Sequence, residues 1–109
     1  MDRPELAIAV DRTPAEAVVS LAGEIDMLTA PRLAATVNEI LVEPPARVVL
    51  DMANVTFCDS QGLGTLVVLS RKATTARSVL VLANVADFLL RVLDITGLRS
   101  ALMVTSTAP

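Results

Sequence analysis

The 109-residue chain contains no histidine, no tryptophan and no tyrosine, and it has a single cysteine, Cys58. Without histidine it lacks the usual general base of enzymes and the commonest metal ligand. Neither a Ser-His-Asp nor a Cys-His catalytic site can therefore form within one copy, and we expect no enzyme, no metal and no cofactor. One cysteine excludes an internal disulfide and fits a reducing compartment, so we expect a cytoplasmic protein.

Long apolar runs and an excess of positive charge are also missing. No stretch approaches the ~20 consecutive apolar residues of a transmembrane helix, and the charged segment Met1–Glu5 does not resemble a signal peptide. The net charge is −3, which argues against binding to the phosphate backbone of nucleic acids. We therefore expect neither nucleic acid nor a membrane as a partner.

Apolar sequence, by contrast, is plentiful enough for one core. Hydrophobic residues make up 53% of the chain, and its two aromatic residues are both phenylalanine. The core must then be built from leucine, valine, isoleucine and alanine. A chain of this length buries roughly 65% of its unfolded surface on folding. We expect a single domain over residues 1–109, with flexible ends at 1–4 and 105–109.

Alternating strand and helix patterns predict an α/β fold. Residues 6–10 and 16–22 are predicted strands, and the short turn between them favours an antiparallel hairpin. Helices are then expected at 29–43, 63–76 and 85–97, and strands at 47–51, 78–83 and 101–104. Strands separated by helices predict right-handed crossovers and a mostly parallel sheet, in which only the first strand is antiparallel. The two central strands are apolar on both faces and should place these side chains in the core: Val48, Leu50, Leu80 and Leu82.

The segment Val55–Thr65 is predicted to be the loop between the third strand and the second helix. It reads Val-Thr-Phe-Cys-Asp-Ser-Gln-Gly-Leu-Gly-Thr. Ser60 is expected at the helix N-cap, because a serine oxygen can accept a hydrogen bond from an N–H group one turn into the helix. A surface loop that carries several apolar groups is more often functional than a plain connector.

Three segments of the chain resemble the STAS domain, and most closely the bacterial anti-sigma factor antagonists. They are Val55–Gly64, which holds the Asp-Ser-x-Gly motif, the Gly-Glu-hydrophobic-Asp turn within Leu21–Asp26, and the helix ending in Gly-Leu within Phe88–Leu98. The resemblance covers roughly the whole chain in order. It implies the STAS fold, which agrees with the predicted order of strands and helices.

The resemblance also implies a binding switch. In that family the serine directly after the aspartate is phosphorylated by a partner that is both anti-sigma factor and kinase, and Ser60 is the matching position. Unphosphorylated, the chain would bind a GHKL-type anti-sigma factor kinase and so free a sigma factor. Phosphorylated on Ser60, it would let go until a serine phosphatase resets it. Gln61 stands where the family usually has a second Ser or Thr, so a back-up acceptor is missing.

The partner is expected to contact the central loop and the neighbouring turn. The residues implied are Asp26, Asp59, Ser60, Gln61, Gly62, Leu63 and Gly64. The residue types alone leave other roles open: Ser60 as a plain N-cap, the two acids as ordinary turn residues, and the glycines as sites of close helix–strand packing. Cys58 is expected to be a small hydrophobe, whose pKa the adjacent acid raises.

Two further functions compete with the antagonist. One is an accessory STAS subunit of a membrane transporter. The intact Asp-Ser-x-Gly loop in a free-standing acidic chain favours the antagonist over this alternative. The other is a receiver-like phosphorylation domain, because Asp51 is expected to close a central strand. A receiver also needs an acidic pair after its first strand and a late lysine, whereas only Asp11 is present at the first place. We expect a monomer or a weak dimer.

Overall fold

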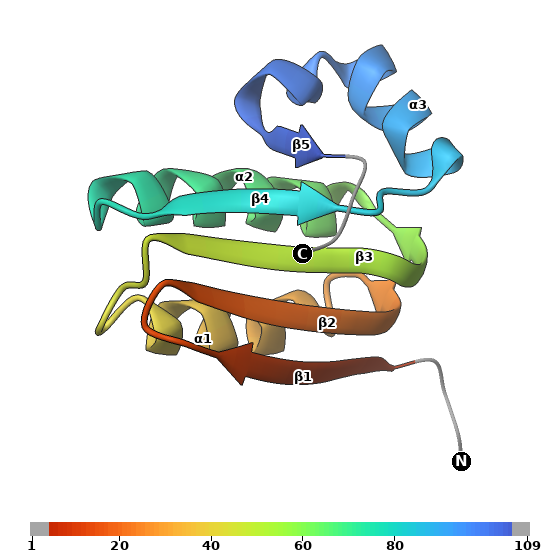
Figure 1. Ribbon diagram of the computed structural model, residues 1–109. Coiled ribbons are helices and arrows are strands. Elements are labelled where there is room, and N and C mark those ends of the chain that lie inside the picture. Colours follow the sequence, from red (N-terminus) through yellow and green to blue (C-terminus); the bar gives the residue numbers. More distant parts are fainter. Residues whose placement is uncertain (1–4, 106–109) are drawn as a thin grey trace.

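A computed structural model describes residues 5–105. Its elements are β1 (Leu6–Arg12), β2 (Glu16–Ile25), α1 (Ala30–Ile40), β3 (Arg47–Cys58), α2 (Ser60–Thr75), β4 (Val79–Ala83), α3 (Asp87–Thr96), a 3₁₀ turn (Leu98–Ala101) and β5 (Met103–Thr105). The strands form one sheet in the order β1-β2-β3-β4-β5 (Figure 1). Only β1 and β2 pair antiparallel. The predicted α/β fold, with its mostly parallel sheet and antiparallel first strand, is confirmed.

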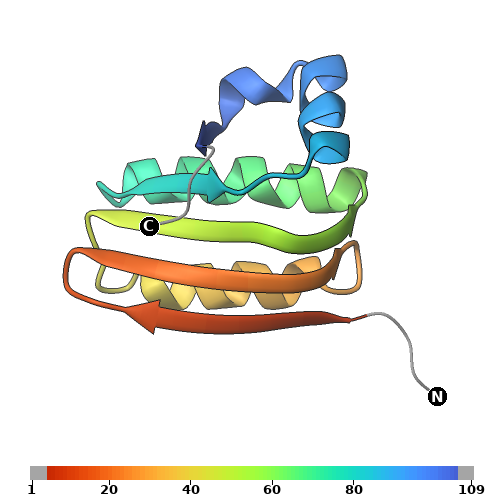
Figure 2. The same ribbon diagram turned by 45° about the vertical axis from the view of Figure 1, so that its right-hand side comes forward.

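The helices are unevenly distributed over the sheet. Helices α1 and α2 lie side by side on one face, whereas α3 lies beyond the edge formed by β4 and β5 (Figures 1 and 2). The core fills the space between the sheet and the first two helices. The expected core residues of the central strands are each at most 2% exposed: Val48, Leu50, Leu80 and Leu82. In α3 only Leu89 and Leu93 are buried.

Strand β3 is longer than the sequence predicted and takes up the first part of the expected loop. We expected it to end at Asp51, but it runs to Cys58 because β2 continues beside it. The pairing shifts register twice, between Ser20 and Ala22 and between Gly23 and Glu24 on β2. Bulges of this kind interrupt the alternation by which a strand is recognised. The prediction of a loop before Cys58 is therefore wrong.

Asp51 lies inside β3 and not at its end. Its Oδ1 accepts hydrogen bonds from the backbone N–H of Ala53 and from the Nδ2 of Asn84, both at 3.1 Å. The side chain thus serves the local backbone and the turn after β4. The comparison with a receiver aspartate, which rested on Asp51 closing a strand, is wrong.

At the C-terminal end of the described chain, one residue differs from the expected flexibility. Thr105, expected to fray, pairs with Ala83 as the last residue of β5. The other expectations of flexibility, for residues 1–4 and 106–109, lie outside the described residues.

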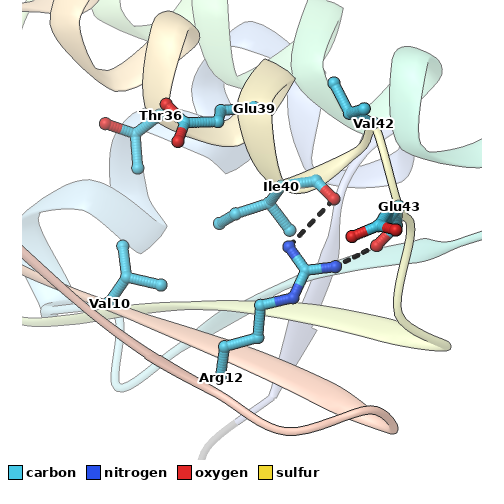
Figure 3. A pocket seen from close by; sticks show the side chains of 7 residues that line it. All are labelled: Val10, Arg12, Thr36, Glu39, Ile40, Val42 and Glu43. Atoms are coloured by element: carbon cyan, nitrogen blue, oxygen red, sulfur yellow. Dashed lines mark hydrogen bonds between the residues drawn. The ribbon is translucent and has the colours of Figure 1, made fainter.

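Arg12, near the amino ends of the parallel strands, joins β1 to α1. Its guanidinium donates to the carbonyl oxygen of Ile40 at 3.1 Å and also to that of Glu43 (Figure 3). The last carbonyls of a helix have no partner within the helix and carry partial negative charge, so a guanidinium stabilises them. A hollow of about 540 Å³ adjoins this contact. The role of Arg12 there is to close the end of α1.

Candidate functional site

The carboxyl ends of β2 and β3 meet at one edge of the sheet. Ile25 and Cys58 are the last pair in their parallel register, so the turn Asp26–Thr29 lies beside Asp59. Open parallel sheets commonly place their binding sites outside this edge. Asp26 and Asp59 therefore lie at the same edge of the sheet.

Asp59 links the two turns through both oxygens of its carboxylate. Oδ1 accepts from the backbone N–H of Gly62 at 2.8 Å, and Oδ2 accepts from that of Met27 at 3.3 Å. Its own N–H donates to the carbonyl oxygen of Ile25 at 3.1 Å. Asp59 is thus the N-cap of α2, with an extended backbone. The prediction that Ser60 occupies the N-cap is wrong, because aspartate caps a helix as well as serine does and the helix begins one residue earlier than expected.

Ser60 is instead the first helical residue of α2, and it is exposed. Within residues 5–105 its hydroxyl makes no hydrogen bond, so it is open to a reacting partner. The first N–H groups of a helix lack partners within the helix and attract anions. A phosphate on Ser60 would lie next to those groups and next to the carboxylate of Asp59.

The two glycines of the motif have different surroundings. A Cβ on Gly62 would lie 2.5 Å from the carbonyl oxygen of Ile25 and 2.9 Å from the Sγ of Cys58, so α2 can approach the strands only with glycine here. A Cβ on Gly64 would meet no atom within 4 Å. Within the helix, Leu63 is buried, whereas Gln61 and Gly64 are exposed to solvent. Of the expected contact residues, Gly62 and Leu63 hold the motif in place, and Ser60, Gln61 and Gly64 form its outer surface.

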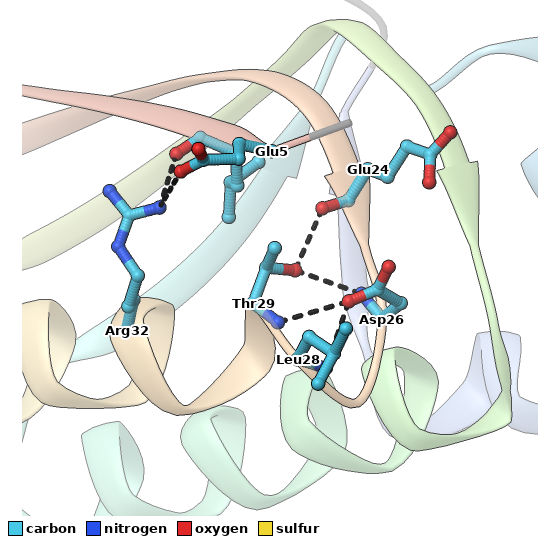
Figure 4. A network of polar contacts seen from close by, with 7 residues as sticks. Glu5, Glu24, Asp26, Leu28, Thr29 and Arg32 are labelled. Carbon is cyan, nitrogen blue, oxygen red and sulfur yellow. Dashed lines mark hydrogen bonds and ion pairs between the residues drawn. The ribbon is translucent and has the colours of Figure 1, made fainter. Parts of the chain in front are cut away.

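The turn after β2 is held by Asp26 and Thr29. Asp26 Oδ1 accepts from the N–H of Leu28 at 2.9 Å and from that of Thr29 at 3.0 Å. Thr29 Oγ1 accepts from the N–H of Asp26 at 2.9 Å and donates to the carbonyl oxygen of Glu24 at 2.7 Å (Figure 4). Thr29 occupies the expected N-cap position of α1 but turns its side chain back into the turn. The two side chains therefore make this turn a rigid support for the exposed residues between them.

Sequence reasoning missed three exposed apolar residues beside Ser60. Met27 is 65% exposed, Leu28 56% and Phe57 46%. They come from the two segments that Asp59 joins, so they flank Ser60 on the same edge of the sheet. We name Met27, Leu28 and Phe57 the apolar rim. The signal in the sequence was large apolar residues within two positions of the two acids, which the predicted core did not include. Grouped apolar side chains on a surface mark interaction sites.

Cys58 closes the bottom of the site and is 9% exposed. Burial, together with the neighbouring carboxylate of Asp59, raises the pKa of its thiol to about 12. The expected rise is confirmed, although burial is the larger cause and the acidic neighbour the smaller. A neutral thiol of this kind packs as a small hydrophobe.

Residues 5–105 offer little for other chemistry. Histidine, cysteine, aspartate and glutamate nowhere gather there in a group of three or more that could hold a metal ion. No helix of that part of the chain is long and apolar enough to cross a bilayer. The edge of the sheet instead combines an open hydroxyl, two fixed acids and the apolar rim, which together suit contact with another protein.

A family model described as "Mlab, STAS domain" matches residues 8–105. This chain belongs to the STAS domain family. Among curated relatives of the STAS chain, the anti-sigma-B factor antagonist of Listeria monocytogenes is 33% identical over 86 residues, which cover 79% of this chain and 75% of the relative. The family resemblance inferred from the three sequence segments is therefore confirmed.

Solved structures show the same fold. An anti-sigma factor antagonist from Mycobacterium paratuberculosis superposes with a TM-score of 0.79 at 26% identity, covering 94% of this STAS chain and 87% of that one. The unphosphorylated anti-sigma factor antagonist SpoIIAA superposes with a TM-score of 0.74 at 16% identity, covering 94% and 90%. At that lower identity the similarity concerns the fold alone.

Proposed function

We propose that this STAS protein is an anti-sigma factor antagonist that binds an anti-sigma factor while Ser60 is unmodified and releases it once Ser60 carries a phosphate. The relative in Listeria monocytogenes is named an anti-sigma-B factor antagonist, and it is 33% identical to this chain. The observation that carries the mechanism is the position of Ser60, the exposed first residue of α2. The protein acts by binding and by accepting a phosphate, and it performs no catalysis itself.

Binding draws on the apolar rim around the serine. Covering Met27, Leu28 and Phe57 removes exposed apolar surface from water, which favours the complex. A kinase that transfers phosphate to Ser60 must cover the same surface. Acceptor site and binding site therefore coincide, with Asp26, Gln61 and Gly64 at their margin.

Phosphorylation then opposes this contact. It adds about −1.5 to −2 charges at pH 7, and burying an unpaired charge in an interface is expensive. The adjacent carboxylate of Asp59 is held by the N–H groups of Gly62 and Met27. Because it cannot turn away without losing both bonds, its repulsion of the phosphate persists.

We further propose that the partner is a serine kinase of the GHKL type and that a serine phosphatase resets the switch. The bare hydroxyl of Ser60 supports transfer to that residue, and Gln61 provides no second acceptor. The protein would act in the cytoplasm as a monomer or weak dimer. The alternative role, an accessory subunit of a transporter, is not favoured, since the curated relative is an antagonist.

The experiment is capture of the partner followed by phosphoryl transfer. Immobilised protein is exposed to lysate, the bound anti-sigma factor is purified, and the pair is incubated with ATP. Intact mass and peptide mapping should locate one phosphate on Ser60 and none on Ser60→Ala. Phosphate on Thr56 or Thr65, or capture of a transporter ATPase in place of a kinase, would refute the proposal.

A further inference from the structure

Two adjoining hollows run along the outer surface of α2, away from the sheet. One, of about 320 Å³, lies between α1 and α2 and is walled by Ala34 and Gly64. The other, of about 390 Å³, lies beside the second half of α2. Val68 and Lys72 line both hollows. They therefore form one continuous groove along Gln61–Thr75, which we name the α2 groove.

Small and apolar residues line the α2 groove together with polar ones such as Gln61, Thr65 and Thr75. Gly64 has open space where a Cβ would stand, and Val68 is 49% exposed. Ala34 lies opposite on α1. Small residues let another backbone approach closely, and the groove follows nearly the whole of the 16-residue helix α2. An elongated apolar groove of this kind suits the apolar face of a helix from a partner.

Positive charge collects at the far end of the α2 groove. The segment 60–86 contains Arg71, Lys72 and Arg77 but no aspartate or glutamate, although the whole chain has a net charge of −3. Within residues 5–105, neither Arg71 nor Lys72 forms an ion pair, whereas three other arginines do. One basic residue in the last turn is explained by the helix dipole. Two unpaired basic residues lining an apolar groove indicate an acidic partner.

We propose that the α2 groove binds an acidic amphipathic helix of the same anti-sigma factor that covers Ser60. The inference rests on the proposed function and adds a second contact to it. Gln61 and Gly64 belong both to the groove and to the surface around Ser60, so a partner on Ser60 already lies at the mouth of the groove. The apolar face of the helix packs on Gly64 and Val68, and its carboxylates pair with the basic side chains beyond.

The two contacts act independently because they are far apart. Ser60 and Lys72 are separated by about 18 Å along the helix, at about 1.5 Å per residue. Changes at sites this distant usually add. A phosphate on Ser60 therefore weakens one end of the interface only. The groove contact keeps a weak, salt-sensitive hold on the partner, since exposed charge pairs are screened by salt.

Lys72 is the single lysine of the chain, which makes a direct test possible. A carbodiimide couples its amine to a carboxylate of the bound anti-sigma factor, with loss of one water. Peptide mapping should find Lys72 joined to an aspartate or glutamate that lies in a helix of the partner. The product should disappear in Lys72→Arg, which keeps the charge but does not couple. Absence of any Lys72 product from a complex that has formed would overturn the proposal.

Affinity measurements separate this proposal from the proposed function. Lys72→Glu should weaken binding about tenfold, because an attraction becomes a repulsion. Arg91→Glu, the same charge change on the exposed surface of α3, should leave it unchanged. If Ser60→Glu weakens binding and Lys72→Glu does not, the proposal that the partner binds the α2 groove is refuted, whereas the proposed switch at Ser60 is supported. If neither variant changes the affinity, both are wrong.

The groove can also be tested without the partner. The isotope-labelled protein is titrated with a synthetic helix that carries leucines on one face and glutamates on the other, and NMR spectra are followed. Amide signals of Gly64, Val68 and Lys72 should shift, and less so in high salt. A matched helix with lysines in place of the glutamates should leave them in place. Equal shifts with both helices, or none with either, would overturn the proposal.

Discussion

At the scale of single residues, Asp59 organises the site more than Ser60, the proposed phosphate acceptor. Its carboxylate closes the N-terminus of α2 through Gly62 and reaches the other turn through Met27. The residue thus controls both the start of the helix and the position of the apolar rim. Ser60 is exposed beside it, and its hydroxyl is available for reaction because Asp59 caps the helix in its place.

Asp59→Ala should lower the free energy of unfolding by ~0.5–2 kcal/mol, the usual cost of losing an N-cap side chain. Asp59→Asn is the matched control, because asparagine caps equally well and keeps a side-chain oxygen. Urea denaturation of the two variants and the wild type measures the difference. Equal losses in both variants would show that the negative charge, and not the cap, carries the stability.

Gly62 and Gly64 provide a paired test at two positions of one helix. Gly62→Ala should destabilise by ~1–3 kcal/mol, because the new Cβ collides with the carbonyl oxygen of Ile25. Gly64→Ala should stabilise by up to ~1 kcal/mol, since alanine is the better helix former and the space is empty. Thermal and urea unfolding of both variants measures the two effects. The same sign for both variants would contradict the packing described at Gly62.

Cys58 should make the stability depend on alkaline pH. Its pKa is raised from 9.0 to about 12 in the folded state, so the unfolded chain loses this proton first. Unfolding is therefore favoured as pH rises above 9, and stability contributed by the neutral thiol is lost progressively towards pH 12. Denaturant titrations at several pH values should show a decline that is shallower in Cys58→Ala. Since the chain has no tyrosine and one lysine, few other groups titrate there. Parallel curves for the two proteins would contradict the buried, protonated thiol.

At the scale of elements, β3 is the strand on which the site depends. It pairs with β4 over its first half and continues beside β2 to Cys58. The extension carries the chain to the edge where Asp59 starts α2. Because β2 ends at the same level, the two turns of the site are brought together by strand pairing alone.

Leu50→Ala tests whether the first half of β3 lies in the core. Leu50 is 0% exposed, so its truncation should cost ~2–5 kcal/mol, the usual range for a buried leucine. Val42→Ala is the control, because Val42 is 79% exposed and should change stability by less than about 0.5 kcal/mol. Urea denaturation of both variants measures these costs. A loss at Leu50 as small as that at Val42 would place β3 on the surface and contradict the topology.

At the scale of the whole molecule, the surface near α2 has two ends of different character. The edge of the sheet holds the acidic residues Glu24, Asp26 and Asp59 together with the apolar rim, and the far end of α2 holds Arg71 and Lys72. A partner that spans both ends can bind in one orientation only, since opposite charges suppress the reversed one. A phosphate on Ser60 would add to the negative end and leave the positive end unchanged.

The switch itself predicts an ordered series of affinities for the anti-sigma factor. Ser60→Ala should bind as the wild type does, because the hydroxyl lacks a partner within residues 5–105. Ser60→Glu should bind at least about tenfold more weakly, which corresponds to ~1.4 kcal/mol. Isothermal calorimetry measures all three proteins. Equal affinities would contradict a charge-operated switch at this position.

Much of the fold was predictable from local patterns. The spacing of apolar residues located all three helices and the central strands, because a helix or strand must bury one face whatever its neighbours are. The STAS motif placed Asp59 and Ser60 together at the start of a helix, because the motif and the helical pattern lie within a few residues of each other. The acidic neighbour also indicated the direction of the Cys58 pKa.

The sequence by itself thus determined the order of elements, the α/β class and the motif that contains Ser60. Only the tertiary structure decided that β3 reaches Cys58, because β2 had to lie beside it through two register shifts. It also decided that Asp59 and not Ser60 caps α2, since the carboxylate is held by Met27 from another turn. The apolar rim and the α2 groove are likewise tertiary, because each joins residues from separate segments that only packing brings together.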